Sequence, residues 1–258
     1  MAEINFLCVH KKTRSMRLAP MLIREITRRV NLYDIYQAIY TSGTTLPTPF
    51  GGAVYWHRNL NPIKTVECGF AFKPQGQTLA SFAKKNRLPE NPFLQGIREF
   101  EKKDLPAVTK LLNDHLAENY KVHITFSEED AWHWLAPRKG VFYCYVVEQE
   151  GKITDLLSYY ELNSHVLNNA KYDRINIAYA SYCVAKDNTD ERLKQVFKDC
   201  LILAKKDGFD VFNVTEVMQH KRVIEDLMFK VGDGKLHHYF FNWKVPYCQP
   251  EDIGIILM

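Results

Sequence analysis

Residues 3–20, EINFLCVHKKTRSMRLAP, contain the arrangement that decides the fold. Apolar residues alternate with others over Glu3–Val9, which predicts a strand. A basic loop follows over His10–Arg17, and Pro20 suits the first turn of a helix. This stretch therefore predicts a strand, a basic loop and a helix in direct succession.

Such a junction is a candidate anion site. The start of a helix offers unpaired backbone N–H groups and the positive end of the helix dipole. Arg14 and Arg17 add positive charge beside it, although the spacing matches neither of the common glycine-rich phosphate motifs. A phosphate or pyrophosphate would be held there. A solvated basic turn that only caps the helix explains the same residues, and the sequence alone leaves both interpretations open.

Outward from this unit, strands and helices alternate along the chain, which predicts an α/β or mixed α+β fold. The sequence Gly232-Asp233-Gly234 predicts a sharp turn. We expect strands over Gly96–Phe100, Ile175–Ala185, Phe209–Val214, Leu236–Trp243 and Ile253–Met258, and a hairpin of Val141–Glu148 with Ile153–Leu162. We expect helices from Pro20, Asp104 and Ser127 and over Asp190–Lys206 and Val217–Met228, and a shorter helix or turn over Leu32–Thr41.

The composition is that of an ordinary globular protein. Hydrophobic residues make up 46% and charged residues 25% of the 258 residues, and the formal net charge is +4. This charge is mild and gathers near the start of the chain, so a local anion site is favoured over a nucleic-acid groove.

The cysteines and apolar runs predict a location. The six cysteines form no C-x-x-C pair, and several lie in apolar strand-like runs, so we expect buried free thiols in a reducing compartment. No signal peptide and no membrane span is expected, and the predicted location is cytoplasmic. His237 and His238 point to opposite faces of a strand, so no metal site is expected there.

The segment Glu3–Lys11 closely resembles a signature of the N-myristoyltransferase family (glycylpeptide N-tetradecanoyltransferases). A second signature near Phe229–Gly234 matches less well, because Met228 and Lys230 stand where the family usually has lysine and glycine. Met16 also replaces a usual lysine. Further matching blocks, in the family's order, are Ile23–Val30, Tyr55–Arg58, Asp210–Asn213 and Asn242–Trp243.

The resemblance implies an acetyltransferase-like (GNAT-like) fold with two pseudosymmetric halves, of which this chain carries the end of the first half and a complete second half. Residues 1–80 would be the remainder of the N-terminal acyl-CoA-binding half. Residues 81–95 would be a linker, and 96–258 the C-terminal peptide-binding half. Most of the fatty-acyl pocket would be absent, and a bare apolar face would favour association.

The family's activity is transfer of myristate from myristoyl-CoA to the N-terminal glycine amine of proteins. This reaction needs no permanently bound cofactor and no metal. The resemblance implies myristoyl-CoA and peptides or proteins with an N-terminal glycine as partners, and it is compatible with peripheral contact to membranes or ribosomes. The backbone N–H groups of Phe6 and Leu7 would form the oxyanion hole. The coenzyme A phosphates would contact Arg14, Ser15, Arg17, Leu18 and Ala19.

The catalytic base in the family is the C-terminal carboxylate, which here belongs to Met258. Independently, Ile253–Met258 is an apolar strand that ends in an obligatory charge, and burial of that charge needs a partner such as an amine. Burial would also raise its pKa from about 3.5. A last residue that simply reaches solvent is the alternative that the sequence alone favours.

Ten further positions would line the peptide cleft. Thr41 and Asn213 would hold the amine, and Asp233 would attract a lysine of the peptide. His57, Ser164 and Tyr179 would contact its first residues. The full set is Asn5, Thr41, Tyr55, His57, Ser164, Tyr179, Asn213, Asp233, Gly234 and Leu236.

Two alternatives stay open. The absent half and the departures at Met16, Met228 and Lys230 favour a truncated, non-catalytic peptide-binding relative or fragment. A general amine acetyltransferase of the same superfamily would need no large acyl pocket, but the peptide-cleft positions argue against it.

Overall fold

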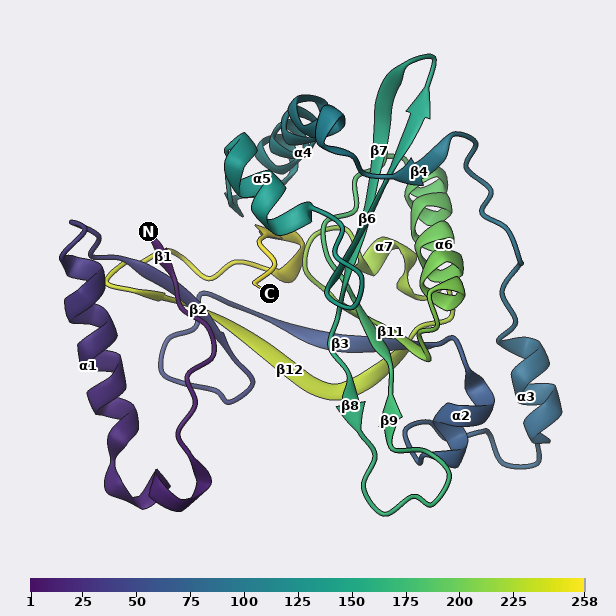
Figure 1. The fold of residues 1–258 in the computed structure, drawn as a ribbon, viewed down its shortest axis with the longest axis horizontal. Coiled ribbons are helices and arrows are strands. Elements are labelled where there is room, and N and C mark those ends of the chain that lie inside the picture. Colours follow the sequence, from purple (N-terminus) through teal and green to yellow (C-terminus); the bar gives the residue numbers. More distant parts are fainter. Residues whose placement is uncertain (258) are drawn as a thin grey trace.

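The computed structural model describes residues 1–257, and its centre is a nine-stranded mixed sheet (Figure 1). Its strands are β1 (Ala2–Glu3), β2 (Ala38–Ser42), β3 (Gly51–Asn59), β4 (Ile97–Glu99), β6 (Phe142–Gln149), β7 (Lys152–Glu161), β10 (Ile177–Ala180), β11 (Val211–Thr215) and β12 (Lys230–Phe241). Their order is β1-β2-β12-β3-β11-β10-β7-β6-β4. The pairs β1–β2 and β10–β11 are parallel, and the other neighbouring pairs are antiparallel.

Two small pairs of strands lie outside this sheet. One joins β5 (Val122–His123) to β13 (Ile253–Gly254) in parallel, and the other is an antiparallel pair of β8 (Ser164–His165) and β9 (Arg174–Ile175).

Helices cover both faces of the sheet. They are α1 (Leu18–Asn31), α2 (Pro62–Glu67), α3 (Leu79–Lys85), α4 (Leu105–Asn119), α5 (Glu128–Leu135), α6 (Asp190–Lys206) and α7 (Lys221–Ile224), with 3-10 turns at Lys11–Met16, Lys102–Asp104 and Pro250–Asp252. Figure 1 shows β6 and β7 between the α4–α5 pair and α6. Each side has its own hydrophobic core, one containing α6 and the other containing α4, α5 and residues 248–255.

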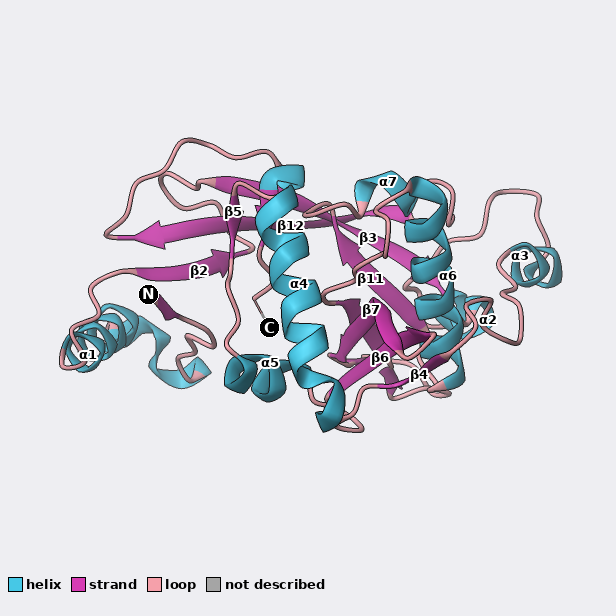
Figure 2. Ribbon diagram, turned by 90° about the horizontal axis from the view of Figure 1, so that it is seen from above, coloured by secondary structure: helices cyan, strands magenta, loops and turns pink. Residues whose placement is uncertain are grey.

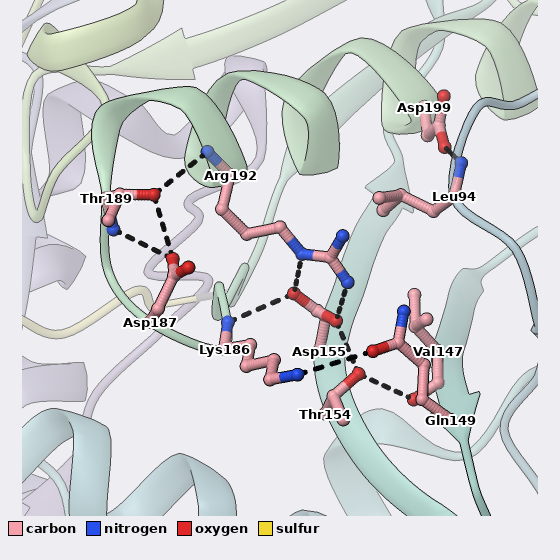
Figure 3. A network of polar contacts seen from close by, with 10 residues as sticks. All are labelled: Leu94, Val147, Gln149, Thr154, Asp155, Lys186, Asp187, Thr189, Arg192 and Asp199. Carbon is pink, nitrogen blue, oxygen red and sulfur yellow. Dashed lines mark hydrogen bonds and ion pairs between the residues drawn. The ribbon is translucent and has the colours of Figure 1, made fainter.

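Helix α6 forms over the predicted residues because side chains that stabilise helix ends stand at both of its ends. The Thr189 side chain accepts a hydrogen bond from the Arg192 N–H at 3.2 Å, and two lysines occupy the last turn. Arg192 also donates to the fully buried carboxylate of Asp155 on β7, at 2.8 and 2.6 Å (Figure 3). The start of α6 is therefore fixed to the sheet.

The predicted hairpin is confirmed as β6 and β7. Glu150 and Gly151 connect them with φ values of 51° and 73°, the positive pair that a tight hairpin turn requires. Helix α4 also begins as predicted, after a capping box at Glu101 and Asp104.

Two predictions near the N-terminus are wrong in detail. The strand predicted over Glu3–Val9 ends at Glu3, although the Ile4 N–H still donates to the Ile39 carbonyl at 2.9 Å. The segment Leu32–Thr41 turns and then enters strand β2 rather than a second helix. Its β-branched and aromatic residues suit a strand that pairs on both edges.

Three predictions near the C-terminus also need correction. Gly232-Asp233-Gly234 is not a turn but an irregularity inside β12, where the register against β3 shifts between Val231 and Lys235. Only Lys221–Ile224 of the helix predicted over Val217–Met228 is helical, and the positive φ values of Met218 (57°) and Met228 (62°) interrupt helical backbone on both sides. The strand predicted over Ile253–Met258 is limited to Ile253–Gly254, and Met258 lies outside the described residues.

The sheet is continuous across the predicted domain boundary. Strand β12 lies between β2 and β3, so strands of segment 1–80 and of segment 96–258 share one ladder. The segment 81–95 overlaps helix α3, and the division into these parts stays a prediction. Among residues 1–257, no helix is both long enough and apolar enough to cross a membrane.

Helix α1 stands apart from both cores. It has no buried residue, and Met21, Leu22, Ile23 and Ile26 are between 41% and 62% exposed. The predicted apolar stripe is thus present without a partner among the described residues.

Candidate active site

The predicted phosphate loop is a 3-10 turn followed directly by α1. The His10 ring accepts a hydrogen bond from the Lys12 N–H at 3.2 Å and so caps the turn. Arg17 ends the turn with a φ of 54°, and no side chain caps the start of α1. The N–H groups of the first helical turn, which includes Leu18 and Ala19, therefore remain available to an anion beside the exposed Arg17.

Phe6 and Leu7 lie in an exposed, kinked segment. Phe6 has a φ of 58°, which is unusual for a bulky residue, and its side chain is 89% exposed. Within residues 1–257, the N–H groups of Phe6 and Leu7 donate no hydrogen bond. Because β1 runs parallel to β2, this segment leaves the sheet in the direction of Thr41 on β2. Two free amides here could stabilise a developing oxyanion.

The strand register places the central predicted residues on one face of the sheet. Asn213 lies opposite both His57 and Tyr179. Tyr55 lies opposite Thr215, and residues paired in a ladder project from the same face. Leu236 pairs with Ala53, two residues before Tyr55, so it shares this face as well. Thr41 reaches the same face because it pairs with His238, two residues after Leu236.

This face encloses a narrow cavity of about 30 Å³, which is enough for a water molecule or a small ammonium group. Of the predicted residues, Tyr55, Tyr179, Asn213 and Leu236 line it. The other lining residues are Tyr160, Ala180, Val214, Thr215, Val217, His238, Ile255, Ile256 and Leu257.

The C-terminal segment is held against this face by several contacts. The Ile256 N–H donates to the hydroxyl of the buried Tyr182 at 3.1 Å, and the Met218 N–H donates to the Ile253 carbonyl at 3.1 Å. A Cβ on Gly51 would lie 2.4 Å from Ile253 Cδ1, so a larger residue there would displace the Ile253 side chain. The described chain therefore leads to the cavity at Leu257.

The polar side chains that line the cavity are those of Asn213, three tyrosines, Thr215 and His238. The His57 Nδ1 lies 2.6 Å from Asn213 Oδ1, and the Tyr179 hydroxyl also hydrogen-bonds Asn213. Burial raises the pKa of Tyr55 to about 12, and it raises the pKa of Tyr160 and Tyr179 as well. These phenols are therefore neutral hydrogen-bond donors near pH 7.

Six predicted peptide residues lie outside the cavity lining, and two of these, Thr41 and His57, project from the same face of the sheet. Asn5 donates to the Glu3 carboxylate at 2.6 Å, and Ser164 is exposed on β8. Asp233 is exposed in the irregular part of β12. Gly234 borders Tyr55, because a Cβ there would lie 3.1 Å from the Tyr55 ring. No group of three or more potential metal ligands occurs within residues 1–257.

Sequence reasoning did not single out Tyr160 or Thr215, and it weighed His238 only as a metal ligand. The alternating pattern of residues 153–162 indicated which residues of the strand share a face with Tyr160. Its neighbours across the ladder were needed to bring it to the cavity, where its ring stacks on Tyr179 with centroids 5.4 Å apart.

Comparison with known proteins identifies the family to which the chain belongs. The chain matches the family described as "Myristoyl-CoA:protein N-myristoyltransferase, C-terminal domain" over residues 67–255 and the corresponding N-terminal domain over residues 1–52. The glycylpeptide N-tetradecanoyltransferase of Plasmodium falciparum is 46% identical over 258 residues, which are 100% of this chain and 62% of that protein. Glycylpeptide N-tetradecanoyltransferase 1 of Arabidopsis thaliana is 44% identical, with 100% of this chain and 59% of that protein covered.

Among solved structures, the crystal structure of Saccharomyces cerevisiae N-myristoyltransferase with bound myristoyl-CoA matches with a TM-score of 0.94 and 34% identity, over 99% of this chain and 68% of that chain. This match shows that the chain has the acetyltransferase-like fold of a protein N-acyltransferase. Since the C-terminal description alone covers more than half of it, the chain belongs to the N-myristoyltransferase family. It spans about three fifths of the length of the curated relatives it matches.

Proposed function

We propose that this chain transfers myristate from myristoyl-CoA to the N-terminal glycine amine of protein substrates. The observation that carries the proposal is the shared face of Thr41, Tyr55 and Asn213, which surrounds a cavity that the C-terminal segment enters. The names of the relatives, which are glycylpeptide N-tetradecanoyltransferases, support the same reaction.

In the proposed reaction the neutral glycine amine attacks the thioester carbonyl carbon. The C–N bond forms, the C–S bond breaks, and coenzyme A leaves as its thiol. The carbonyl oxygen becomes negative in between, and the free amides of Phe6 and Leu7 stabilise that charge without reorganising. The strained φ of Phe6 supports a functional reason for this conformation.

The proton of the glycine ammonium must pass to a base before attack. We assign this role to the α-carboxylate of Met258. The support is the path of the preceding residues, because Ile255, Ile256 and Leu257 all line the cavity. An apolar lining would disfavour the charged carboxylate and so strengthen it as a base.

The remaining predicted residues are assigned to coenzyme A, to the peptide amine or to the peptide chain. Arg14, Ser15, Arg17, Leu18 and Ala19 hold the phosphates of coenzyme A. Thr41 and Asn213 hold the amine, and Tyr55, His57, Tyr179 and Leu236 surround the first peptide residues. Asn5, Ser164, Asp233 and Gly234 act further out, with Asp233 attracting a lysine. The cytosol is the proposed location, and residues 1–80 and 96–258 are the proposed halves.

An acylation assay tests the proposal. The purified chain is incubated with myristoyl-CoA and a peptide that begins Gly-x-x-x-Ser, and acylated peptide is measured by mass spectrometry. We expect product from the native chain and none from a variant with two residues appended after Met258. The matched control carries the same two residues ahead of Met1. A folded native chain that gives no product would contradict the proposal.

A non-catalytic peptide-binding relative or fragment is the second candidate. The observation that favours it is the exposure of Phe6, Leu7 and the apolar stripe of α1, which leaves the acyl side of the site open. Peptide binding without product would support this candidate. Formation of at least one equivalent of acylated peptide per protein molecule would exclude this candidate.

A further inference from the structure

His238 is a buried histidine at the cavity that no part of the proposed mechanism uses. It lies on β12, on the face shared with Leu236, and its side chain is only 1% exposed. It lines the cavity together with Asn213 and Leu257. It also pairs with Thr41 across the β2–β12 ladder, so the two Cβ atoms are direct neighbours.

The imidazole of His238 has no hydrogen-bond partner within residues 1–257. Its Nδ1 is fully enclosed without a partner, and no hydrogen bond joins Nε2 to any described residue. The other two buried histidines each have a ring contact, because His115 contacts the Tyr120 hydroxyl at 3.3 Å and His220 contacts the Thr215 carbonyl at 2.9 Å, although the His220 Nε2 is also enclosed without a partner. A buried polar group without a partner costs folding free energy, so its presence calls for a reason.

The surroundings suit a neutral ring. Burial lowers the pKa of His238 to about 4, with a smaller effect from His237. At neutral pH one ring nitrogen therefore carries a lone pair and the other a hydrogen. Such a ring is too weak a base to take a proton from an ammonium, but it can accept a hydrogen bond from one. Phe50, whose ring centroid lies 5.9 Å away, packs beside it.

We propose that His238 is a positioning residue for the peptide amine. This inference rests on the function proposed above. The unpaired imidazole of His238 accepts a hydrogen bond from the N-terminal amine of the bound peptide, beside Thr41 and Asn213. The amine thereby supplies the partner that the ring lacks, and it is held in the narrow end of the cavity next to Leu257.

The test compares two substitutions. His238→Phe keeps a flat ring without polar atoms, and His238→Asn places an amide near the position of Nδ1. Binding is measured by fluorescence anisotropy with peptides that begin Gly-x-x-x-Ser and carry the label at their C-terminus. One peptide has a free N-terminal amine and the other is N-acetylated, and a non-hydrolysable myristoyl-CoA analogue is present throughout.

We expect His238→Phe to raise the Kd of the free-amine peptide about tenfold, the effect of losing one ordinary hydrogen bond. The Kd of the acetylated peptide should not change, and His238→Asn should recover most of the lost affinity. The Tm of His238→Phe should stay equal or rise, because an unpaired polar group is replaced by an apolar ring of similar shape.

Three results would overturn the inference. If His238→Phe binds the free-amine peptide as tightly as the native chain, His238 does not position the amine. If it lowers Tm and weakens both peptides equally, its role is structural. If the native chain binds neither peptide, the proposed function fails first and this inference fails with it, so the two failures are distinguishable.

Discussion

Gly232 is the residue that lets His57 reach Asn213. A Cβ at position 232 would lie 2.1 Å from His57 Nε2 and 3.1 Å from the Tyr55 carbonyl, so His57 would have to move. The irregular register of β12 brings this glycine over the imidazole. A backbone feature of one strand thus controls a side-chain contact of the next.

Gly232→Ala should therefore break the 2.6 Å contact between His57 and Asn213. We expect a loss of about 1–3 kcal/mol in the free energy of unfolding and weaker peptide binding, because overpacking displaces the ring. Urea unfolding and peptide titration measure both effects. Gly43→Ala is the control, since the nearest atom to its new Cβ would be 3.7 Å away. Equal behaviour of the two variants would contradict this account.

The three buried histidines predict a loss of stability in mild acid. Burial lowers the pKa of His115, His220 and His238 to about 4, against about 6.5 in the unfolded chain. The unfolded state therefore binds more protons below pH 6.5. The contribution of these histidines to the free energy of unfolding is at its full value above pH 6.5. It falls toward pH 4, by up to about 1.4 kcal/mol per pH unit for each histidine.

Denaturant unfolding at pH 7, 6 and 5 checks this dependence. His115→Gln should reduce the slope by about one third, whereas the same change at the exposed His165 should leave it unchanged. A slope that is the same in all three proteins would show that other groups cause the acid sensitivity.

At the residue scale, a strand pattern and the family resemblance together brought several predicted residues to one cavity, and their roles stay predictions. Tyr55, Tyr179 and Asn213 were predicted and line the cavity. Tyr160 and His238 were not predicted as site residues. The alternating pattern of a strand shows which of its side chains share a face. Only the neighbouring strands decide which of the two faces carries the site.

At the scale of elements, the attachment of α6 to β7 is a buried charge pair. Asp155 is 0% exposed, and it also accepts from the Lys186 N–H at 3.0 Å and from the Thr154 hydroxyl at 2.6 Å. Figure 3 shows these groups converging on the one carboxylate. Loss of the guanidinium would leave a buried negative charge without its main partner.

Arg192→Met should thus destabilise the chain by about 3–5 kcal/mol. Lys194→Met, on the same helix, removes an ion pair with Asp226 in which both side chains are about half exposed, and it should cost less than about 1 kcal/mol. Chemical denaturation of both variants provides the comparison. Similar losses would mean that the Asp155 pair contributes no more than a surface pair.

Element prediction followed the strength of the local signals. Helix α6 has a threonine cap, terminal lysines and Gly208 beyond its end, and its predicted bounds are confirmed. Strand β12 contains two glycines around an aspartate, which ordinarily mark a turn, so tertiary pairing with β2 and β3 overrode the local preference.

At the scale of the whole molecule, the apolar surface is concentrated at the N-terminal end. Phe6, Leu7, Met16, Leu32 and Tyr33 are between 54% and 89% exposed, in addition to the apolar stripe of α1. Figure 2 shows α1 beyond the edge of the sheet, away from α4 and α6. Exposed apolar side chains gathered at one end of the chain favour association.

Replacing Met21 and Ile26 together by lysine should reduce self-association of the isolated chain. Sedimentation velocity at several protein concentrations measures the effect. The matched control is Leu167→Lys, which changes an 82% exposed leucine away from α1 and should leave association unchanged. Unaltered association in the double variant would place the contact elsewhere.

The fold class followed from the alternation of strands and helices, but the strand order did not. Nothing local in residues 230–241 indicates that this strand separates β2 from β3. Pairing between segments so distant in sequence depends on the global packing of the two cores, which no short pattern encodes.

This insertion has a consequence for the chain as it is being made. The Leu46 N–H donates to the Tyr239 hydroxyl across a separation of 193 residues, and β2 and β3 are joined through β12, which lies between them. At about 5–20 residues per second, translation delivers β12 roughly 10–40 s after β3. The growing polypeptide must therefore carry two unpaired strand edges until β12 is made, and the face that carries the cavity assembles only after that point.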